Sequence, residues 1–174
     1  QIFIDKDRGA QIFVQASGGT YLALHNGVPT GFSPLKALAN RAEDKSFLSL
    51  FIRQLVRADG KPISVQEERL IEDGINAVMK LGVADRSLSA LRSMLGMKDS
   101  SGVGARLEKW TSEGSLGWVF DNPADSMTLN ARFIGFDMTD FLDNADIRTP
   151  VMLYLFHRID QLLTGERMVI CIDE

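Results

Sequence analysis

The chain has 174 residues, a length that suits one domain or one domain with a subdomain. Apolar residues make up 45% of it, enough for a globular core, and the net charge of −4 excludes a general attraction for nucleic acid or an acidic membrane. The single cysteine excludes an internal disulfide, and no stretch approaches the roughly 20 apolar residues of a membrane span. We expect this residue, Cys171, to be a small core residue in a reducing compartment.

The first part of the chain predicts a strand, a helix and a second strand, at residues 1–5, 8–17 and 21–24. The helix carries Ile12, Phe13 and Ala16 at helical spacing, and Gly18 is a candidate for its C-terminal cap. Prolines and glycines across residues 28–38 indicate a loop.

The middle of the chain predicts four helices, at residues 44–58, 64–81, 85–95 and 105–110. The second helix opens with a capping box, in which Ser64 and Glu67 each cap the backbone N–H of the other. A loop rich in glycine and aromatic residues follows at residues 113–123.

The end of the chain predicts a strand at residues 132–136, a connector, a helix and a final strand. We expect the helix to begin at Thr149, whose hydroxyl can cap it, because Pro150 suits the first helical turn, and to end at Gly165. The unbroken apolar run at residues 168–172 is typical of a strand buried on both faces of a parallel sheet.

Strands that alternate with helices predict a parallel sheet covered by helices, so the expected fold class is α/β. The helices in the middle of the chain interrupt this alternation. We therefore expect residues 1–43 and 124–174 to form the sheet domain and residues 44–123 to be an all-helical insertion into it.

Two adjacent carboxylates, Asp173 and Glu174, follow the final strand. Such a pair is typical of the Walker B motif of P-loop nucleotidases, in which the Asp helps to hold Mg²⁺ and the Glu polarises a water. The alternative is a pair of solvated acids at a strand end. The matching phosphate loop, G-x-x-x-x-G-K-[ST], is absent, because Pro62 follows the Gly-Lys pair at residues 60–61.

Two groups of motifs resemble one protein family. The first group is GFDMT at residues 135–139, YLFHRI at 154–159 and IDE at 172–174, and the second is DKDRG at 5–9, GGTY at 18–21 and GFSPL at 31–35. Together they resemble the CagE/TrbE/VirB family of type IV secretion and conjugation ATPases, over nearly the whole chain.

The resemblance implies a RecA-like P-loop ATPase domain with a helical insertion, of which this chain is the part from after the Walker A helix to the end of the Walker B strand. ATP and Mg²⁺ would be cofactors of the intact protein, with Asp173 at the metal and Glu174 as the catalytic residue at the water. Because the family's phosphate-binding lysine and Mg²⁺-binding hydroxyl are not in this chain, we expect the chain to be a fragment that is inactive alone.

The resemblance also implies a location and partners. The intact protein would lie on the cytoplasmic face of the bacterial inner membrane and would energise assembly of a secretion channel or pilus, or substrate transfer through it. It would act with other type IV secretion components and associate with itself as a hexamer. Unpaired strand edges favour self-association of the fragment too.

Three polar residues after the first strand are further candidates. Asp5, Lys6 and Asp7 follow a strand whose C-terminal end would line the ligand crevice of a parallel sheet, so they could lie near the nucleotide. A charged turn at a strand end is the simpler interpretation.

Three arginines are candidates for an arginine finger, which acts on the γ-phosphate across a subunit boundary. These are Arg8, Arg148 and Arg158. Surface ion pairs are the commoner role of arginine. No metal-ligand spacing joins His25 or His157 to another ligand, so we expect both histidines to be structural.

Two other classes of function remain open. The helical insertion could be a docking or oligomerisation module without chemistry of its own. The intact protein could also be a DNA translocase, but the chain is acidic and shows no basic stripe that would bind DNA.

Overall fold

The computed structural model describes residues 1–57, 62–96, 99–163, 165 and 167–173. The chain divides into two compact units, of which unit 1 combines Gln1–Val28 with Met127–Glu174 and unit 2 is Pro29–Ser126. The domain boundaries expected at residues 43 and 123 stay a prediction. Within the described part of the chain, no helix is both long enough and apolar enough to cross a bilayer.

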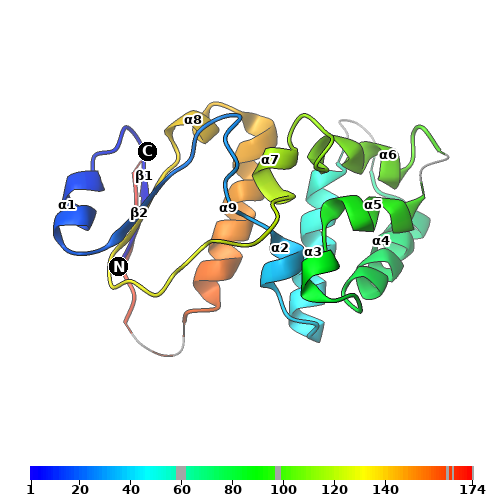
Figure 1. Cartoon of the computed structure of the whole chain (residues 1–174), viewed down its shortest axis with the longest axis horizontal. Coiled ribbons are helices and arrows are strands. Elements are labelled where there is room, and N and C mark those ends of the chain that lie inside the picture. Colours follow the sequence, from blue (N-terminus) through cyan, green and yellow to red (C-terminus); the bar gives the residue numbers. More distant parts are fainter. Residues whose placement is uncertain (58–61, 97–98, 164, 166, 174) are drawn as a thin grey trace. The chain divides into compact units, whose positions relative to one another are not determined.

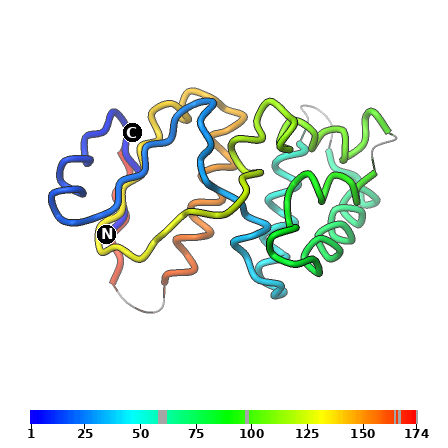
Figure 2. The backbone as a smooth tube through the Cα atoms, viewed as in Figure 1, coloured from blue at the N-terminus to red at the C-terminus, as the bar shows by residue number. Residues whose placement is uncertain are grey.

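The core of unit 1 is a four-stranded parallel sheet in the order β2-β3-β1-β4. Its strands are β1 (Ile2–Asp5), β2 (Thr20–Ala23), β3 (Ile134–Asp137) and β4 (Ile170–Ile172). Because β1 pairs with β4, the two ends of the chain run side by side, as Figure 2 shows. The predicted α/β fold with a parallel sheet is confirmed.

Helices lie on both faces of this sheet (Figure 1). One face carries α1 (Gln11–Ala16), where the ring of Phe13 packs edge-on against that of Phe3, with 5.7 Å between the ring centroids. The opposite face carries α8 (Thr139–Leu142) and α9 (Ala145–Asp160). After β1 the chain therefore continues on one face of the sheet, and after β3 it continues on the opposite face. In open parallel sheets, such a switch point forms a crevice at the C-terminal ends of the strands.

Helix α1 is shorter and more exposed than the spacing of its apolar residues predicts. It begins at Gln11 rather than residue 8, because Asp7 and Arg8 have positive φ angles of 58° and 61°, which a right-handed helix does not allow. Ile12 is 81% exposed and Phe13 51% exposed, and Val14 is its one buried residue. The predicted helix is therefore present, but the apolar residues whose spacing indicated it are exposed.

The start of α9 also differs from the prediction. Asn144 is the N-cap, because its Oδ1 accepts a hydrogen bond from the N–H of Asp146 at 3.1 Å, and Thr149 and Pro150 lie inside the helix. Pro150 has no N–H, so it cannot donate the backbone hydrogen bond that other residues in a helix interior donate. The helix ends at Asp160, before Gly165.

The final strand, β4, is exposed rather than buried on both faces, which corrects the prediction for residues 168–172. Ile170 is 39% exposed and Ile172 56% exposed, and Cys171 is an exposed thiol instead of a core residue. The reason is that β4 is at the edge of the sheet that the described residues form, where its one neighbour is β1. Strength of the apolar pattern does not reveal how many neighbours a strand has.

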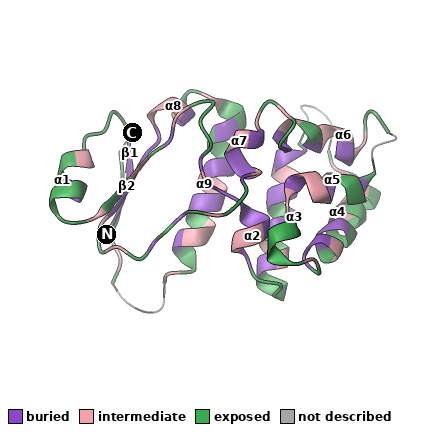
Figure 3. Cartoon of the chain, in the orientation of Figure 1, coloured by how far each residue is buried: buried purple, intermediate pink, exposed green. Residues whose placement is uncertain are grey.

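Unit 2 is helical, and Figure 3 shows the buried sides of its helices. Its helices are α2 (Pro34–Ala37), α3 (Ala42–Leu55), α4 (Val65–Val78), α5 (Leu88–Leu95), α6 (Val103–Leu107) and α7 (Gly117–Phe120), with 3₁₀ turns at Val83–Asp85 and Glu108–Trp110. The predicted capping box of Ser64 and Glu67 is confirmed. Two segments predicted as loops, residues 28–38 and 113–123, contain the short helices α2 and α7, because buried apolar residues hold them in place.

An aromatic cluster and an ion pair hold unit 2 together. The ring of Phe120 packs edge-on against that of Phe51, and its centroid lies 5.7 Å from the centroid of the Trp110 ring. The Trp110 Nε1 donates to the carbonyl of Leu55 at 3.0 Å. Arg106 of α6 pairs with Glu67 of α4, and both side chains are less than one-fifth exposed. The pair therefore joins α6 to the first turn of α4, where Glu67 also takes part in the capping box.

We expect Arg106→Met to lower the free energy of unfolding of unit 2 by about 3 kcal/mol, because it removes a cation that pairs with the largely buried carboxylate of Glu67. The matched control is Arg53→Met, which breaks the more exposed Arg53–Glu68 pair and should cost less than about 1 kcal/mol. Urea unfolding followed by tryptophan fluorescence measures both, since Trp110 and Trp118 both lie in unit 2. Equal losses in the two variants would contradict the prediction.

Candidate active site

Three aspartates form a row at the C-terminal edge of the sheet. Asp137 of β3 is in register with Asp5 of β1. Asp173 continues the register of β4 against β1, because its N–H donates to the carbonyl of Ile4 at 2.9 Å. Side chains alternate along a strand, and neighbouring strands lie about 4.8 Å apart. The three carboxylates therefore belong to the same face of the sheet, the face that carries α1.

Asp137 is the most completely paired of the three. It is 1% exposed, and it accepts hydrogen bonds from Arg8 Nε at 2.8 Å, Thr139 Oγ1 at 2.6 Å and Thr139 N at 3.0 Å. Burial by itself raises the pKa of Asp137, but the hydrogen bonds from Thr139 and the ion pair with Arg8 outweigh it and lower the pKa below its ordinary value. Asp137 is therefore a charged anchor for Arg8.

Asp5 is held by hydrogen bonds, and no cation in the described part of the chain forms an ion pair with it. It is 3% exposed, and its Oδ2 accepts from Tyr21 Oη at 2.6 Å and from Ala10 N at 2.9 Å. Burial and the hydrogen bond to Asp5 raise the pKa of Tyr21 far above its ordinary value, so this phenol remains a donor at any working pH. Tyr21 comes from β2, two strands away from Asp5.

Gly135 allows this reach across the sheet. It is the β3 residue in register with Tyr21, and a Cβ at this position would overlap the Tyr21 ring. Without a side chain at residue 135, the ring lies over β3 and its hydroxyl meets Asp5 on β1.

The turn after β1 is strained and is held at both ends. Asp7 and Arg8 both have left-handed backbone angles, which are unfavourable for residues other than glycine. Thr139 accepts a hydrogen bond from the N–H of Asp7 at 2.8 Å, and Asp137 binds the Arg8 side chain. These contacts with the GFDMT segment therefore compensate the strain and set the path of the chain from Asp5 to Ala10.

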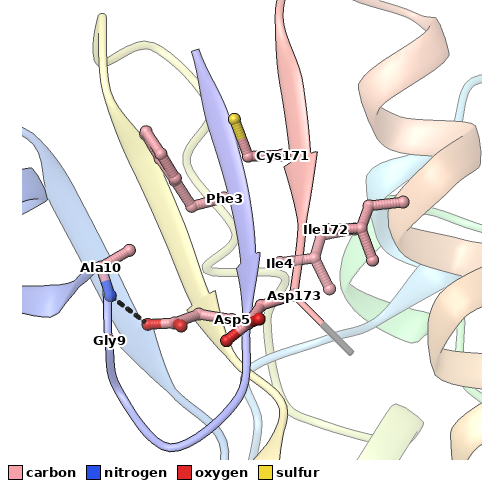
Figure 4. Close-up of a pocket in the computed structure, with 8 residues that line it drawn as sticks. All are labelled: Phe3, Ile4, Asp5, Gly9, Ala10, Cys171, Ile172 and Asp173. Carbon is pink, nitrogen blue, oxygen red and sulfur yellow. Dashed lines mark hydrogen bonds between the residues drawn. The ribbon is translucent and has the colours of Figure 1, made fainter.

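A cavity of about 390 Å³ opens beside this turn, lined by Phe3, Ile4, Asp5, Gly9, Ala10, Cys171, Ile172 and Asp173. Figure 4 shows the carboxylates of Asp5 and Asp173 at the ends of their strands within this lining. Hard carboxylate oxygens suit Mg²⁺, which is commonly held by one or two carboxylates with water and substrate phosphates. Within the described ranges, no three or more His, Cys, Asp or Glu side chains are grouped to hold a metal by themselves. The lining thus fits hydrated Mg²⁺ that has other ligands as well.

The sequence candidates divide between this edge and other places. Asp5 and Asp173 come together, whereas Lys6 is an exposed turn residue. Glu174, the expected catalytic residue, lies outside the described residues. Arg8 is bound to Asp137 of its own chain, an arrangement that favours a structural role.

The two arginines of α9 lie at different levels of the helix. Arg148, near its start, donates to the carbonyl of Leu142 at 2.9 Å. Arg158, ten residues and about 15 Å further along, donates to Tyr154 Oη at 2.8 Å. Figure 1 shows that α9 runs from the C-terminal edge of the sheet toward the opposite edge, so its last turn, which includes Arg158, lies away from the C-terminal ends of the strands.

Sequence reasoning missed the residues that hold the carboxylates. Tyr21, Asp137 and Thr139 were within the quoted motifs but received no role. One local signal was present, since Asp137 and Thr139 directly follow a strand, as Asp5 does. No local signal indicated Tyr21, because its partner lies two strands away.

Proteins of known name resemble the chain over almost its whole length. It is 47% identical over 173 residues to the type IV secretion system protein virB4 of Bartonella henselae, in an alignment that covers 99% of the chain and 22% of that protein. It is 40% identical over 174 residues to protein virB4 of Agrobacterium tumefaciens, with the same two coverages. The chain thus spans 22% of the length of these relatives. No family model matches it.

A solved structure confirms the fold. The structure of VirB4 of Thermoanaerobacter pseudethanolicus matches with a TM-score of 0.73, covering 99% of this chain and 74% of that one. The sequence identity of 17% makes this a likeness of fold alone. The α/β class expected from the sequence agrees with it.

We expect Asp137→Asn to lower the free energy of unfolding of unit 1 by about 1–3 kcal/mol at pH 7, because it removes the charge that anchors Arg8 and Thr139. The folded-state pKa of Asp137 is depressed, so its contribution is present above the unfolded-state pKa and is lost as the pH falls through the folded-state value. Native-state hydrogen exchange of the β3 amides should show the difference from wild type at pH 7 and its disappearance in acid. Asp140→Asn, at a more exposed carboxylate, is the control and should have a smaller effect. A difference that persists unchanged in acid would contradict the assignment.

Proposed function

The chain belongs to the VirB4/TrbE family of type IV secretion proteins, and from this premise we propose that it is part of an ATPase that energises type IV secretion or conjugation. The observation that carries the proposal is the position of Asp173 at the C-terminal end of a parallel strand, beside a cavity that it shares with Asp5. Nucleotide sites of open parallel sheets lie at this edge. A strand that ends in Asp-Glu is what a Walker B motif requires.

The proposed roles follow from the chemistry of the two acids. Asp173 would hold Mg²⁺, directly or through water, and Glu174 would orient and deprotonate the attacking water. Bound Mg²⁺ would neutralise the charge of the ATP phosphates. The turn at residues 6–9 would keep Asp5 at the edge of the same cavity. The phosphate-binding loop must come from outside this chain, since the sequence contains no G-x-x-x-x-G-K-[ST].

The wider role rests on the relatives. Proteins named virB4 belong to type IV secretion systems, so we propose that the intact protein works with other components of such a machine on the cytoplasmic face of the inner membrane. We further propose that it associates with itself. Its cargo could be protein or DNA, and the net charge of −4 offers no support for direct binding of this part to DNA.

In the full-length protein, Asp173→Asn and Glu174→Gln should each lower the rate of ATP hydrolysis at least about 100-fold, the scale of a lost general base or metal ligand. Glu174→Gln should still bind ATP, because it removes only the acid that acts on water. The control is Asp160→Asn, at an exposed acid in the last turn of α9, which should hydrolyse ATP like wild type. Phosphate release measures hydrolysis.

The isolated chain should neither hydrolyse ATP nor bind it tightly, because it lacks the phosphate loop. Turnover by the isolated chain that Glu174→Gln abolished would contradict this. A full-length protein with an intact phosphate loop and no ATP hydrolysis under secretion-competent conditions would rule out the proposed function.

A further inference from the structure

Within the described ranges, cations do not balance the charges in the row of aspartates. Asp137 has the guanidinium of Arg8, but the hydrogen bonds to Asp5 from this part of the chain come from neutral donors. Among the described residues, none forms an ion pair with Asp173. Like charges directly opposite each other on neighbouring strands destabilise a sheet. Asp5 and Asp173 are such neighbours, so their arrangement calls for a cation.

The carboxylate of Asp5 has one oxygen to spare. Both of its hydrogen bonds, from Tyr21 and from Ala10, end on Oδ2, and Oδ1 has no hydrogen bond with the described part of the chain. The residue is 3% exposed, yet it lines the cavity that Asp173 also lines. Oδ1 lies beside Gly9, where a Cβ would be 3.6 Å away. A nearly buried carboxylate with a spare acceptor in a cavity is well suited to a metal ion or its water shell.

We propose that Asp5 is a second carboxylate of the Mg²⁺–nucleotide site and that Tyr21 is its positioning residue. The inference rests on the proposed ATPase function and adds to it. Asp173 would supply one oxygen from β4 and Asp5 Oδ1 another from β1, either to Mg²⁺ or to a water bound to it. Tyr21 holds Oδ2, so it determines which oxygen remains for the metal.

The sheet gives Tyr21 this role through Gly135. The phenol crosses β3 only because residue 135 has no side chain, and its hydroxyl donates to Asp5 at 2.6 Å. A phenylalanine at residue 21 would fill the same space without donating. Gly135→Ala would keep the hydroxyl but displace the ring. The two substitutions remove the same hydrogen bond by different routes.

A purely structural role for Tyr21 predicts a different result. In that case its loss would lower stability and leave metal affinity unchanged. Outer-shell partners of metal ligands typically change metal affinity by about 10–100-fold when they are removed. Metal affinity, measured without turnover, therefore separates the two roles.

The experiment measures Mn²⁺ binding to the full-length protein with saturating ADP, using electron paramagnetic resonance to follow free Mn²⁺. We expect Tyr21→Phe and Gly135→Ala to weaken Mn²⁺ affinity about 10-fold, and Asp5→Asn by about 10–100-fold. The matched control is Tyr154→Phe, which removes the other tyrosine hydroxyl of this chain and its 2.8 Å bond from Arg158, and it should bind like wild type. Thermal unfolding of each variant shows that it is folded.

The outcomes distinguish this inference from the proposed function. If wild type binds Mn²⁺ with ADP and Tyr21→Phe, Gly135→Ala and Asp5→Asn bind it equally well, the inference is overturned and the nucleotide site stands. If only Asp5→Asn loses affinity, Asp5 remains a metal-site carboxylate and the positioning role of Tyr21 is overturned. If wild type itself binds no Mn²⁺ with ADP, the proposed function falls together with the inference.

Discussion

The register of the parallel sheet is the constraint on which the site depends. β1 pairs with β3 and β4 so that Asp137, Asp5 and Asp173 lie opposite one another, on one face and at one edge. A slip of one residue in either pairing would send a carboxylate to the opposite face of the sheet. Short strands limit the backbone hydrogen bonds that resist such a slip. Buried Ile2 and Ile4, which face away from the aspartates, add apolar contacts that favour the observed register.

The three aspartates share a position but differ in their surroundings. Asp137 is paired with Arg8 and two donors of Thr139, Asp5 accepts from neutral groups, and Asp173 is exposed. Charge on the first is thus satisfied within the protein, while charge on the other two faces the cavity. This gradient from β3 to β4 explains why only one side of the row is suited to a cation. The pairing of Asp137 also gives a reason for the strained turn. The left-handed backbone angles at Asp7 and Arg8 bring the Arg8 guanidinium to the Asp137 carboxylate.

Much of the fold could be predicted from local patterns, because strands and helices record their burial in apolar spacing. The parallel sheet, the capping box at Ser64 and the strand ending at Asp5 were all predicted and confirmed. Features that depend on distant neighbours were not. The exposure of β4 reflects its edge position, which an apolar run does not encode. The predicted start of α9 at Thr149 was wrong, because Asn144 caps the helix five residues earlier, before the Thr149-Pro150 signal. At the candidate site, the strand-end positions of Asp5 and Asp173 followed from the sequence, and both residues line one cavity, whereas their roles stay a prediction. Tyr21 was not predicted, since its hydroxyl reaches Asp5 across β3.

The placement of unit 2 between β2 and β3 has a consequence for the order of folding. Pairing these strands would require closure of a very long loop if the segment between them were unfolded, and the entropy cost of closure grows with loop length. Once unit 2 has folded, its two ends are joined, because the N–H of Ser126 donates to the carbonyl of Gly31 at 2.8 Å. The helical unit then behaves as a short connection for the sheet. Its local contacts favour early formation, whereas the sheet must wait for β3 and β4, which follow unit 2 in the sequence. The three carboxylates are therefore brought together only after unit 2 has been synthesised.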